Sequence, residues 1–139
     1  MGGEGRYNRA RLEFVMRISP ERFEQMVLDV ADEVMAKLPP DLRAEAETVV
    51  LDIKDWATPE QADGPPGWLL GLYEGVPLVE RHVDWALLQP DRITLFQGPL
   101  QRLARTEVEL RRQVRRTLVH ELGHFFGFGE DELEKRGWG

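Results

Sequence analysis

The segment from Thr106 to Gly127 restricts the fold more than any other part of the chain, because it carries a helix signal at each end. Thr106, followed three residues later by Glu109, forms a capping box, in which side chains satisfy free N–H groups at a helix start. Apolar residues then recur at helical spacing, at Val114, Leu118 and Leu122. Gly127 stands where a glycine commonly ends a helix. The sequence therefore predicts one long helix between these limits.

A second helix is predicted from Ser19 to about Leu38. Ser19 can cap the helix, Pro20 suits its first turn, and Glu21 faces the positive end of the helix dipole. Apolar residues continue at helical spacing as far as Leu38, and Pro39-Pro40 then stops the helix.

Short extended segments occupy much of the remaining chain. Period-two alternation or apolar runs predict strands at residues 12–18, 49–53 (buried), 68–73 and 93–96, and residues 100–105 are expected to form a helical turn. Helices and strands in this order indicate an α+β fold, with a small mixed sheet, a backing helix and a second long helix. No linker divides the 139 residues, so we expect a single domain over 1–139, with 1–10 frayed.

Composition excludes several function classes. Without cysteine there is no thiol nucleophile and no zinc finger, so only His, Asp or Glu can hold a metal ion. A net charge of −7 argues against nucleic-acid binding, which needs a basic surface. No apolar run approaches the roughly 20 residues of a membrane span, and no signal peptide is seen at the N-terminus. We therefore expect a cytoplasmic chain with no membrane partner. The oligomeric state stays open.

The predicted long helix carries the pattern His120-Glu121-Leu122-Gly123-His124. Histidines four residues apart lie one turn apart on one helix face, where both imidazoles can bind one zinc ion. Glu121 is the candidate general base, because it can accept a proton from a water that zinc has acidified. This is the His-Glu-x-x-His pattern of zinc metalloproteases. The alternative is a pair of histidines that bind no metal.

A zinc site of this kind needs a third protein ligand. A longer form of the pattern has its last ligand three residues after the glycine, at position 130. Glu130 stands there and is the first choice, with Asp131 as runner-up and Glu134 as a distant third.

Several segments together resemble a family of minimal zincin-like proteins, mostly bacterial, that are described as possible zinc metallopeptidases. The matching stretches are residues 21–24, 70–78, 90–96 and 114–127. The resemblance implies a small mixed sheet with a backing helix and an active-site helix. It also implies that His120 and His124 are metal ligands and that Glu121 is the general base. The family usually has Asp where this chain has Glu130.

Other candidate residues have simpler explanations. His82 is expected in a surface loop rather than as an extra ligand, and Tyr73 is expected to pack rather than to stabilise an oxyanion. The basic run Arg111, Arg112, Arg115 and Arg116 is expected to form a salt-bridged, solvated helix face rather than a nucleic-acid patch.

The sequence thus favours a zinc-dependent hydrolase that cleaves peptide bonds in a peptide or protein substrate. We expect the substrate to add to an exposed strand edge, for which the strand at Ile93–Phe96 is the candidate. The alternative is a metal-binding domain without turnover, acting in protein interaction or regulation.

Overall fold

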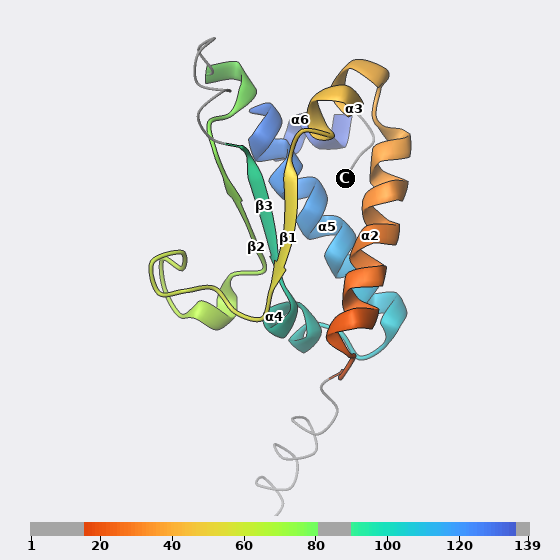
Figure 1. Ribbon diagram of the computed structural model, residues 1–139, viewed down its shortest axis with the longest axis vertical. Coiled ribbons are helices and arrows are strands. Elements are labelled where there is room, and N and C mark those ends of the chain that lie inside the picture. Colours follow the sequence, from red (N-terminus) through yellow and green to blue (C-terminus); the bar gives the residue numbers. More distant parts are fainter. Residues whose placement is uncertain (1–15, 81–89, 136–139) are drawn as a thin grey trace, which may run out of the picture.

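The computed structural model describes residues 16–80 and 90–135, without the side chains of Pro66, Glu130, Leu133 and Glu134. Within these ranges the chain is a mixed α+β fold (Figure 1), which confirms the predicted fold class. The helices are α2 (Pro20–Lys37), α3 (Pro40–Ala46), α4 (Gln97–Arg102), α5 (Glu107–Phe126) and α6 (Glu130–Lys135). The strands are β1 (Val50–Lys54), β2 (Gly71–Glu74) and β3 (Arg92–Phe96), with short 3-10 helices η1 (Pro66–Trp68) and η2 (Leu78–Glu80).

The three strands form one mixed sheet in the order β1-β3-β2. β1 runs parallel to β3, and β2 runs antiparallel to it. The expectation that Ile93–Phe96 forms an exposed edge is therefore wrong, because β3 is hydrogen-bonded on both sides. In the part of the chain that the structure describes, β1 and β2 are the edge strands.

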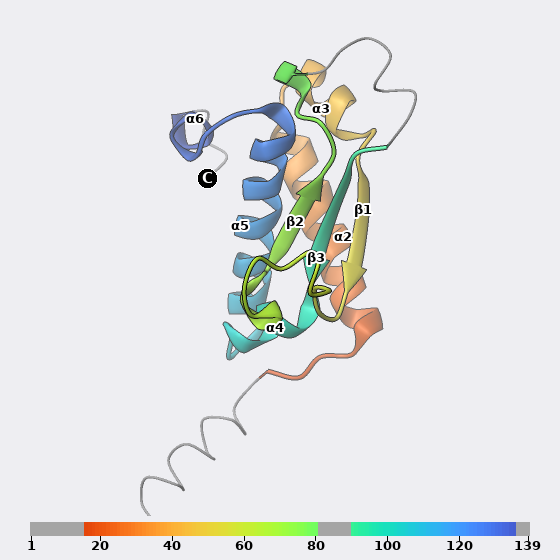
Figure 2. The same cartoon turned by 90° about the vertical axis from the view of Figure 1, so that its left-hand side faces the viewer.

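The two long helices α2 and α5 cover the same face of the sheet (Figure 2). The main hydrophobic core lies between these three elements, and its fully buried members include Phe23, Val27, Val30, Ile93, Leu95, Leu110, Val114 and Phe125. The connection from β1 to β2 forms a smaller cluster with β2 and β3, made of Ala57, Ala62 and Phe96 with Leu69 and Leu72 against it. Leu69 and Leu70 therefore anchor the chain before β2 in two different clusters.

The predicted start of α2 is confirmed, and its end shows an element that the sequence analysis did not predict. Ser19 caps the helix, because its side-chain oxygen accepts a hydrogen bond from the Arg22 N–H at 3.1 Å. Pro40 begins α3 rather than a loop. The Arg43 guanidinium of α3 donates to the carbonyl oxygens of Met35, Ala36 and Leu38, so α3 closes the C-terminal end of α2.

Three of the four predicted strands were correct in place and inexact in extent. β1 is only partly buried, because it is an edge strand. The first residues of the predicted strand 68–73 belong instead to η1, in which the Trp68 N–H donates to the Pro65 carbonyl at 3.1 Å. The predicted turn at 100–105 is the end of α4, which begins directly after β3. Most of the predicted strand 12–18, like the frayed segment 1–10, lies outside the described residues, and residues 16–18 form no strand.

Candidate metal centre

Helix α5 begins and ends where its sequence signals place it. Thr106 Oγ1 accepts a hydrogen bond from the Glu109 N–H at 3.1 Å, and Glu109 reaches back to the Arg105 N–H at 2.6 Å. At the other end Gly127 has φ 80°, a left-handed conformation that glycine adopts without steric cost. The chain turns back there, with hydrogen bonds from the N–H of Gly127 to the His124 carbonyl and from that of Phe128 to the Gly123 carbonyl.

The two histidines of α5 lie side by side on its surface. Their ring centroids are 4.6 Å apart. Their side chains are 42% and 53% exposed, for His120 and His124 respectively, so the pair is open to water. Leu118, Leu122 and Phe125, on the other faces of the helix, are buried in the core. Packing of these apolar residues fixes the rotation of α5 and holds both imidazoles at the surface.

Glu121 completes a cluster with the two imidazoles. Its Oε1 lies 3.4 Å from His124 Nδ1, and its Oε2 lies 3.9 Å from His120 Nε2. One ligand atom from each of the three residues lies within 4.8 Å of the others. Two atoms that bind one tetrahedral zinc ion at about 2.0–2.2 Å are about 3.3–3.6 Å apart. The donors of the cluster lie up to 4.8 Å apart, somewhat farther than this, in a group that could hold a metal ion.

Glu121 is buried, with a relative exposure of 6%. Its Oε1 accepts a hydrogen bond from the backbone N–H of Tyr73 in β2 at 2.9 Å. Among the described residues, Oε2 accepts no hydrogen bond. A buried carboxylate is costly without a compensating charge, which a cation beside the two imidazoles would supply. The chemistry of the donor set thus agrees with a zinc ion.

Tyr73 contributes to this site through its backbone, a role that the sequence analysis missed. Its phenol O–H donates to Asp91 Oδ1 at 2.7 Å, and its ring packs against that of Phe125 in a T-shaped arrangement with centroids 5.9 Å apart. The expectation that the Tyr73 side chain packs is thus in agreement with the structure. The signal that could have revealed the backbone contact is Gly71, a glycine two residues earlier in the same strand.

Gly71 allows β2 to lie close to α5. A Cβ atom at this position would come within 2.6 Å of Thr117 Cγ2, which is closer than real Cβ atoms approach. Thr117 and Glu121 are one helical turn apart on α5, and Gly71 and Tyr73 are two residues apart on β2. The contact of Gly71 with Thr117 is therefore followed, farther along both elements, by the contact of Tyr73 with Glu121. The glycine therefore sets the distance at which the Tyr73 N–H reaches the carboxylate.

The candidates for the third ligand follow the turn at Gly127. Glu130 is the first residue of α6, which lies beside the C-terminal end of α5 (Figure 2). The side chains of Glu130 and Glu134 lie outside the described part of the structure. Asp131 is exposed and does not belong to the cluster found among described residues. His82 also lies outside the described ranges. The assignment of Glu130 stays a prediction.

Two arginines connect α2 and α5 by ion pairs. Arg111, from the basic run, pairs with Glu33 of α2, and Arg22 of α2 pairs with Glu107 at the start of α5. The expected salt-bridged, solvated face is seen at Arg111, whose partner lies on α2. The guanidinium of Arg22 hydrogen-bonds the Glu107 carboxylate and lowers its pKa, while Glu107 raises the pKa of Arg22.

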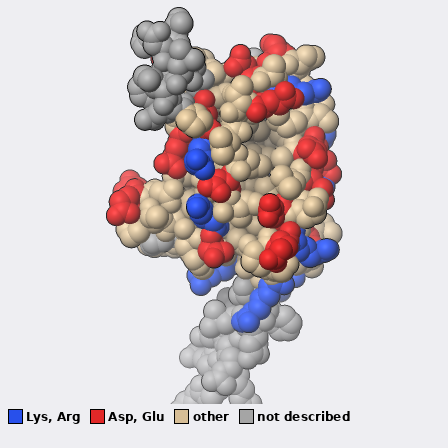
Figure 3. All heavy atoms as spheres, viewed as in Figure 1, with Lys and Arg blue, Asp and Glu red and all other residues tan. Residues whose placement is uncertain are grey.

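A groove of about 440 Å³ lies between α2 and β1, apart from the histidine cluster. Apolar side chains of Val27, Leu28, Leu51 and Ile53 line it together with the acids Glu24, Asp52 and Asp55. Figure 3 shows acidic side chains around uncharged surface on this side of the molecule. None of the cluster residues lines this groove, so it is not part of the candidate metal centre.

Comparison with known proteins agrees with this geometry. Residues 46–138 match the family model described as zincin-like metallopeptidase. The match covers β1 to α6 and includes His120, Glu121 and His124. No curated protein matches the chain. Among the described residues, no helix has the length and apolar character needed to cross a membrane.

Proposed function

The chain belongs to the zincin-like metallopeptidase family, and on this premise we propose that it is a zinc-dependent hydrolase of peptide bonds. The observation that carries the proposal is the cluster of His120, Glu121 and His124, with donor atoms within 4.8 Å of one another beside the edge strand β2. Its substrate is a peptide or protein.

His120 and His124 are the proposed metal ligands, together with a carboxylate that follows α5. Glu130 is the first choice for that carboxylate, and Asp131 and Glu134 are the alternatives. When bound, zinc lowers the pKa of a water molecule and polarises a substrate carbonyl. Without cysteine, these imidazole and carboxylate donors are the ligand types that the chain offers.

Glu121 is the proposed general base. Its Oε1 is held by the Tyr73 N–H, so the carboxylate has a fixed orientation. Oε2, which accepts no hydrogen bond within the described residues, is the oxygen that can take a proton from the attacking water. After cleavage of the bond, the same carboxyl group can return this proton to the leaving amine.

β2 offers the edge at which a peptide can bind. The Phe96 N–H donates to the Leu70 carbonyl at 2.9 Å, so the backbone groups of Leu70 point toward β3. Along an antiparallel strand, the backbone groups of every second residue point toward the partner strand and those of the residues between them point away. The backbone groups of Gly71 and Tyr73 therefore face away from β3, toward the outer edge of the sheet. This edge lies beside Glu121, since the Tyr73 N–H reaches its carboxylate. A peptide that adds here in antiparallel orientation passes close to the cluster.

The edge of β1 is less suitable. Its Val50 N–H points toward β3 and donates to the Asp91 carbonyl. Successive N–H groups of a strand point to alternate sides, so the Ile53 N–H, three residues later, points outward. That outward N–H is already bonded to the Asp52 carboxylate at 2.9 Å. The outward Tyr73 N–H of β2 is likewise bonded, to Glu121, so the difference between the two edges is their position. β1 is the opposite edge of the sheet from β2, and a peptide bound there lies away from the cluster.

Replacement of the base tests the proposed reaction. Glu121→Gln keeps the acceptor for the Tyr73 N–H but removes the proton acceptor. On a mixed peptide library with zinc present, we expect activity to fall about 10²- to 10⁴-fold, the usual contribution of a general base. Zinc content should stay at the wild-type value. Glu60→Gln, in an exposed turn, is the matched control. Unchanged activity in Glu121→Gln would refute the assigned role.

The second candidate is a metal-binding domain without turnover, acting in interaction or regulation. The observation that favours it is the exposure of the site, since about half of each histidine side chain is open to solvent. A site this open has little wall around a substrate. A wild-type chain that binds zinc and cleaves no peptide of a broad library would support this candidate over the hydrolase.

A further inference from the structure

Trp68 is the most exposed large apolar side chain in the described part of the chain, with 80% of its surface open to solvent. Its backbone is nevertheless well anchored. The Trp68 N–H donates to Pro65, and the next two residues, Leu69 and Leu70, pack into the two hydrophobic clusters. The structure thus holds an indole ring in water on a fixed segment, where it is available to a binding partner.

Trp56 provides a contrast within the same connection. Its ring lies 4.8 Å from the Arg102 guanidinium and packs against the backbone of Gly67 and Gly98. Trp56 therefore has a structural role in fixing the connection between β1 and β2. No such packing buries Trp68.

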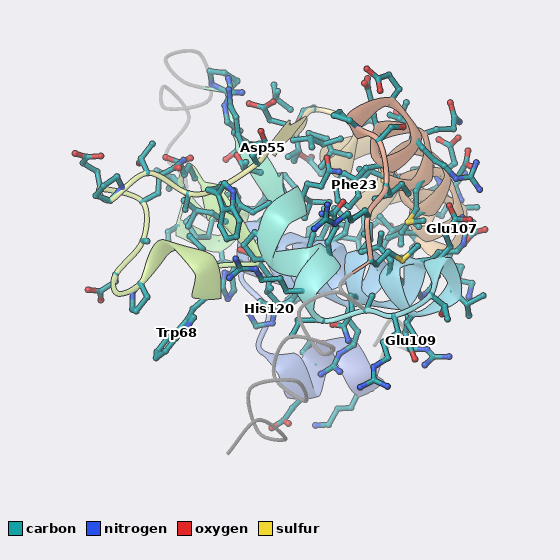
Figure 4. All side chains as sticks on the ribbon, turned by 90° about the horizontal axis from the view of Figure 1, so that it is seen from below. Phe23, Asp55, Trp68, Glu107, Glu109 and His120 are labelled. Atoms are coloured by element: carbon teal, nitrogen blue, oxygen red, sulfur yellow. The ribbon has the colours of Figure 1, made fainter. Side chains whose placement is uncertain are left out.

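The position of Trp68 relates it to the metal centre. It stands three residues before β2, the strand whose Tyr73 N–H binds Glu121. Gly71 lies against Thr117, and Tyr73 lies against Glu121 one turn later, so β2 and α5 run in the same direction. Trp68 therefore precedes the cluster along the outer edge of β2. Figure 4, the view from below, shows Trp68 and His120 on the same side of the molecule.

The direction of the strand determines which part of a substrate meets Trp68. A peptide antiparallel to β2 runs from the Glu74 end of the strand toward its Gly71 end. Residues that follow the scissile bond are therefore the ones that approach Trp68. At a rise of about 3.3 Å per residue, the five positions from Tyr73 to Trp68 span at most about 17 Å, and the 3-10 turn at Trp68 shortens this distance. The indole therefore lies opposite roughly the third to fifth residue after the bond.

We propose that Trp68 determines specificity by binding an aromatic or large apolar side chain on the C-terminal side of the scissile bond. This inference rests on the proposed peptidase function. A planar indole offers a wide apolar face that favours another ring, and the neighbouring backbone edge fixes the register of the peptide.

The test uses the full chain loaded with zinc and a peptide library randomised on both sides of the cleaved bond. We expect the wild type to prefer an aromatic or large apolar residue at one of the third to fifth positions after the bond. In Trp68→Ala, kcat/KM for such peptides should fall about 3- to 10-fold, the strength of an aromatic contact. Peptides with alanine at that position should be cleaved at the wild-type rate, and Trp68→Phe should restore the preference.

Two further variants sharpen the result. Trp68→Glu should shift the preference at the same position toward lysine and arginine. Val108→Ala removes another exposed apolar side chain, at the start of α5, and should leave the preference unchanged. Wild-type selectivity in Trp68→Ala would overturn the role of Trp68 alone. A wild type that cleaves no peptide would instead overturn the peptidase function, and this inference with it.

Discussion

The backbone N–H of Tyr73 and Oε1 of Glu121 are joined by a 2.9 Å hydrogen bond across 48 positions of the sequence. This bond connects an edge strand to the central acid of the histidine cluster. It orients the carboxylate without the use of a second side chain. The strand that we propose to bind substrate and the base that we propose to act on it are therefore positioned by one contact.

Gly71 tests the importance of this contact. Gly71→Ala places a methyl group 2.6 Å from Thr117 Cγ2, so β2 must move away from α5. We expect a loss of about 1–3 kcal/mol in the free energy of unfolding, typical of overpacking. We also expect lower peptidase activity at temperatures where the variant stays folded. Urea unfolding and a peptide cleavage assay measure the two effects.

A double variant serves as the control for Gly71→Ala. Thr117→Ser removes the methyl group that clashes, so Gly71→Ala combined with Thr117→Ser should recover much of the lost stability and activity. Gly129→Ala should change stability little, because no atom lies within 4 Å of a Cβ at that position. Strictly additive effects of the Gly71 and Thr117 substitutions would contradict the steric explanation.

The histidine pair predicts a metal stoichiometry. We expect about one zinc ion per chain, and loss of tight binding in His120→Ala and in His124→Ala, because each variant removes a ligand. Elemental analysis after dialysis measures the content. His82→Ala removes the remaining histidine of the chain and should leave the content unchanged. Equal zinc content in all four proteins would show that the cluster is not the metal site.

The helix and its cluster could be predicted because every signal for them is local. Thr106, Glu109 and Gly127 set the limits of α5, and the spacing of its two histidines sets their common face. These features depend on residues within one turn of each other. Neither the sheet nor the other helices had to be known.

The sheet order could not be predicted, because it depends on pairing between distant segments. β3 directly precedes α4 and α5 in the chain, which suggested an edge position, yet β1 and β2 enclose it. The role of Tyr73 was missed for a related reason, since its backbone rather than its phenol meets Glu121. Helix α3 was missed because proline ends one helix and also suits the first turn of the next.

The ion pair of Arg22 and Glu107 predicts a pH dependence of stability. The hydrogen bond from Arg22 holds the pKa of Glu107 below its usual value. The positive charge of Arg22 also lowers this pKa, whereas partial desolvation of the carboxylate raises it. Glu107 therefore stabilises the fold above about pH 4.3, its ordinary unfolded pKa, and this contribution disappears as the pH falls through the lower folded pKa. Because both side chains are exposed, the effect is small.

Thermal unfolding of Glu107→Gln measures this contribution. The variant should melt below the wild type at pH 7, and the difference should shrink as the pH falls through the lowered folded pKa of Glu107 and also in high salt. Glu45→Gln, an exposed acid of α3, is the control and should show no such pattern. A difference that does not shrink as the pH is lowered would assign the effect to packing rather than to charge.

The third metal ligand is the last prediction, and the turn after α5 supplies its physical basis. The Phe128 N–H donates to the Gly123 carbonyl at 2.8 Å, which reverses the chain at the end of the helix that carries both histidines. Glu130 follows two residues later as the first residue of α6. We expect Glu130→Ala to weaken zinc binding by at least about tenfold, since a zinc site of this type has three protein ligands. Glu130→Asp should retain part of the affinity, because a carboxylate remains. Asp131→Ala and Glu134→Ala should bind zinc like the wild type, as measured by competition with a chelator of known affinity. Loss of binding in Asp131→Ala, with Glu130→Ala unaffected, would transfer the role to Asp131 and leave the histidine pair in place.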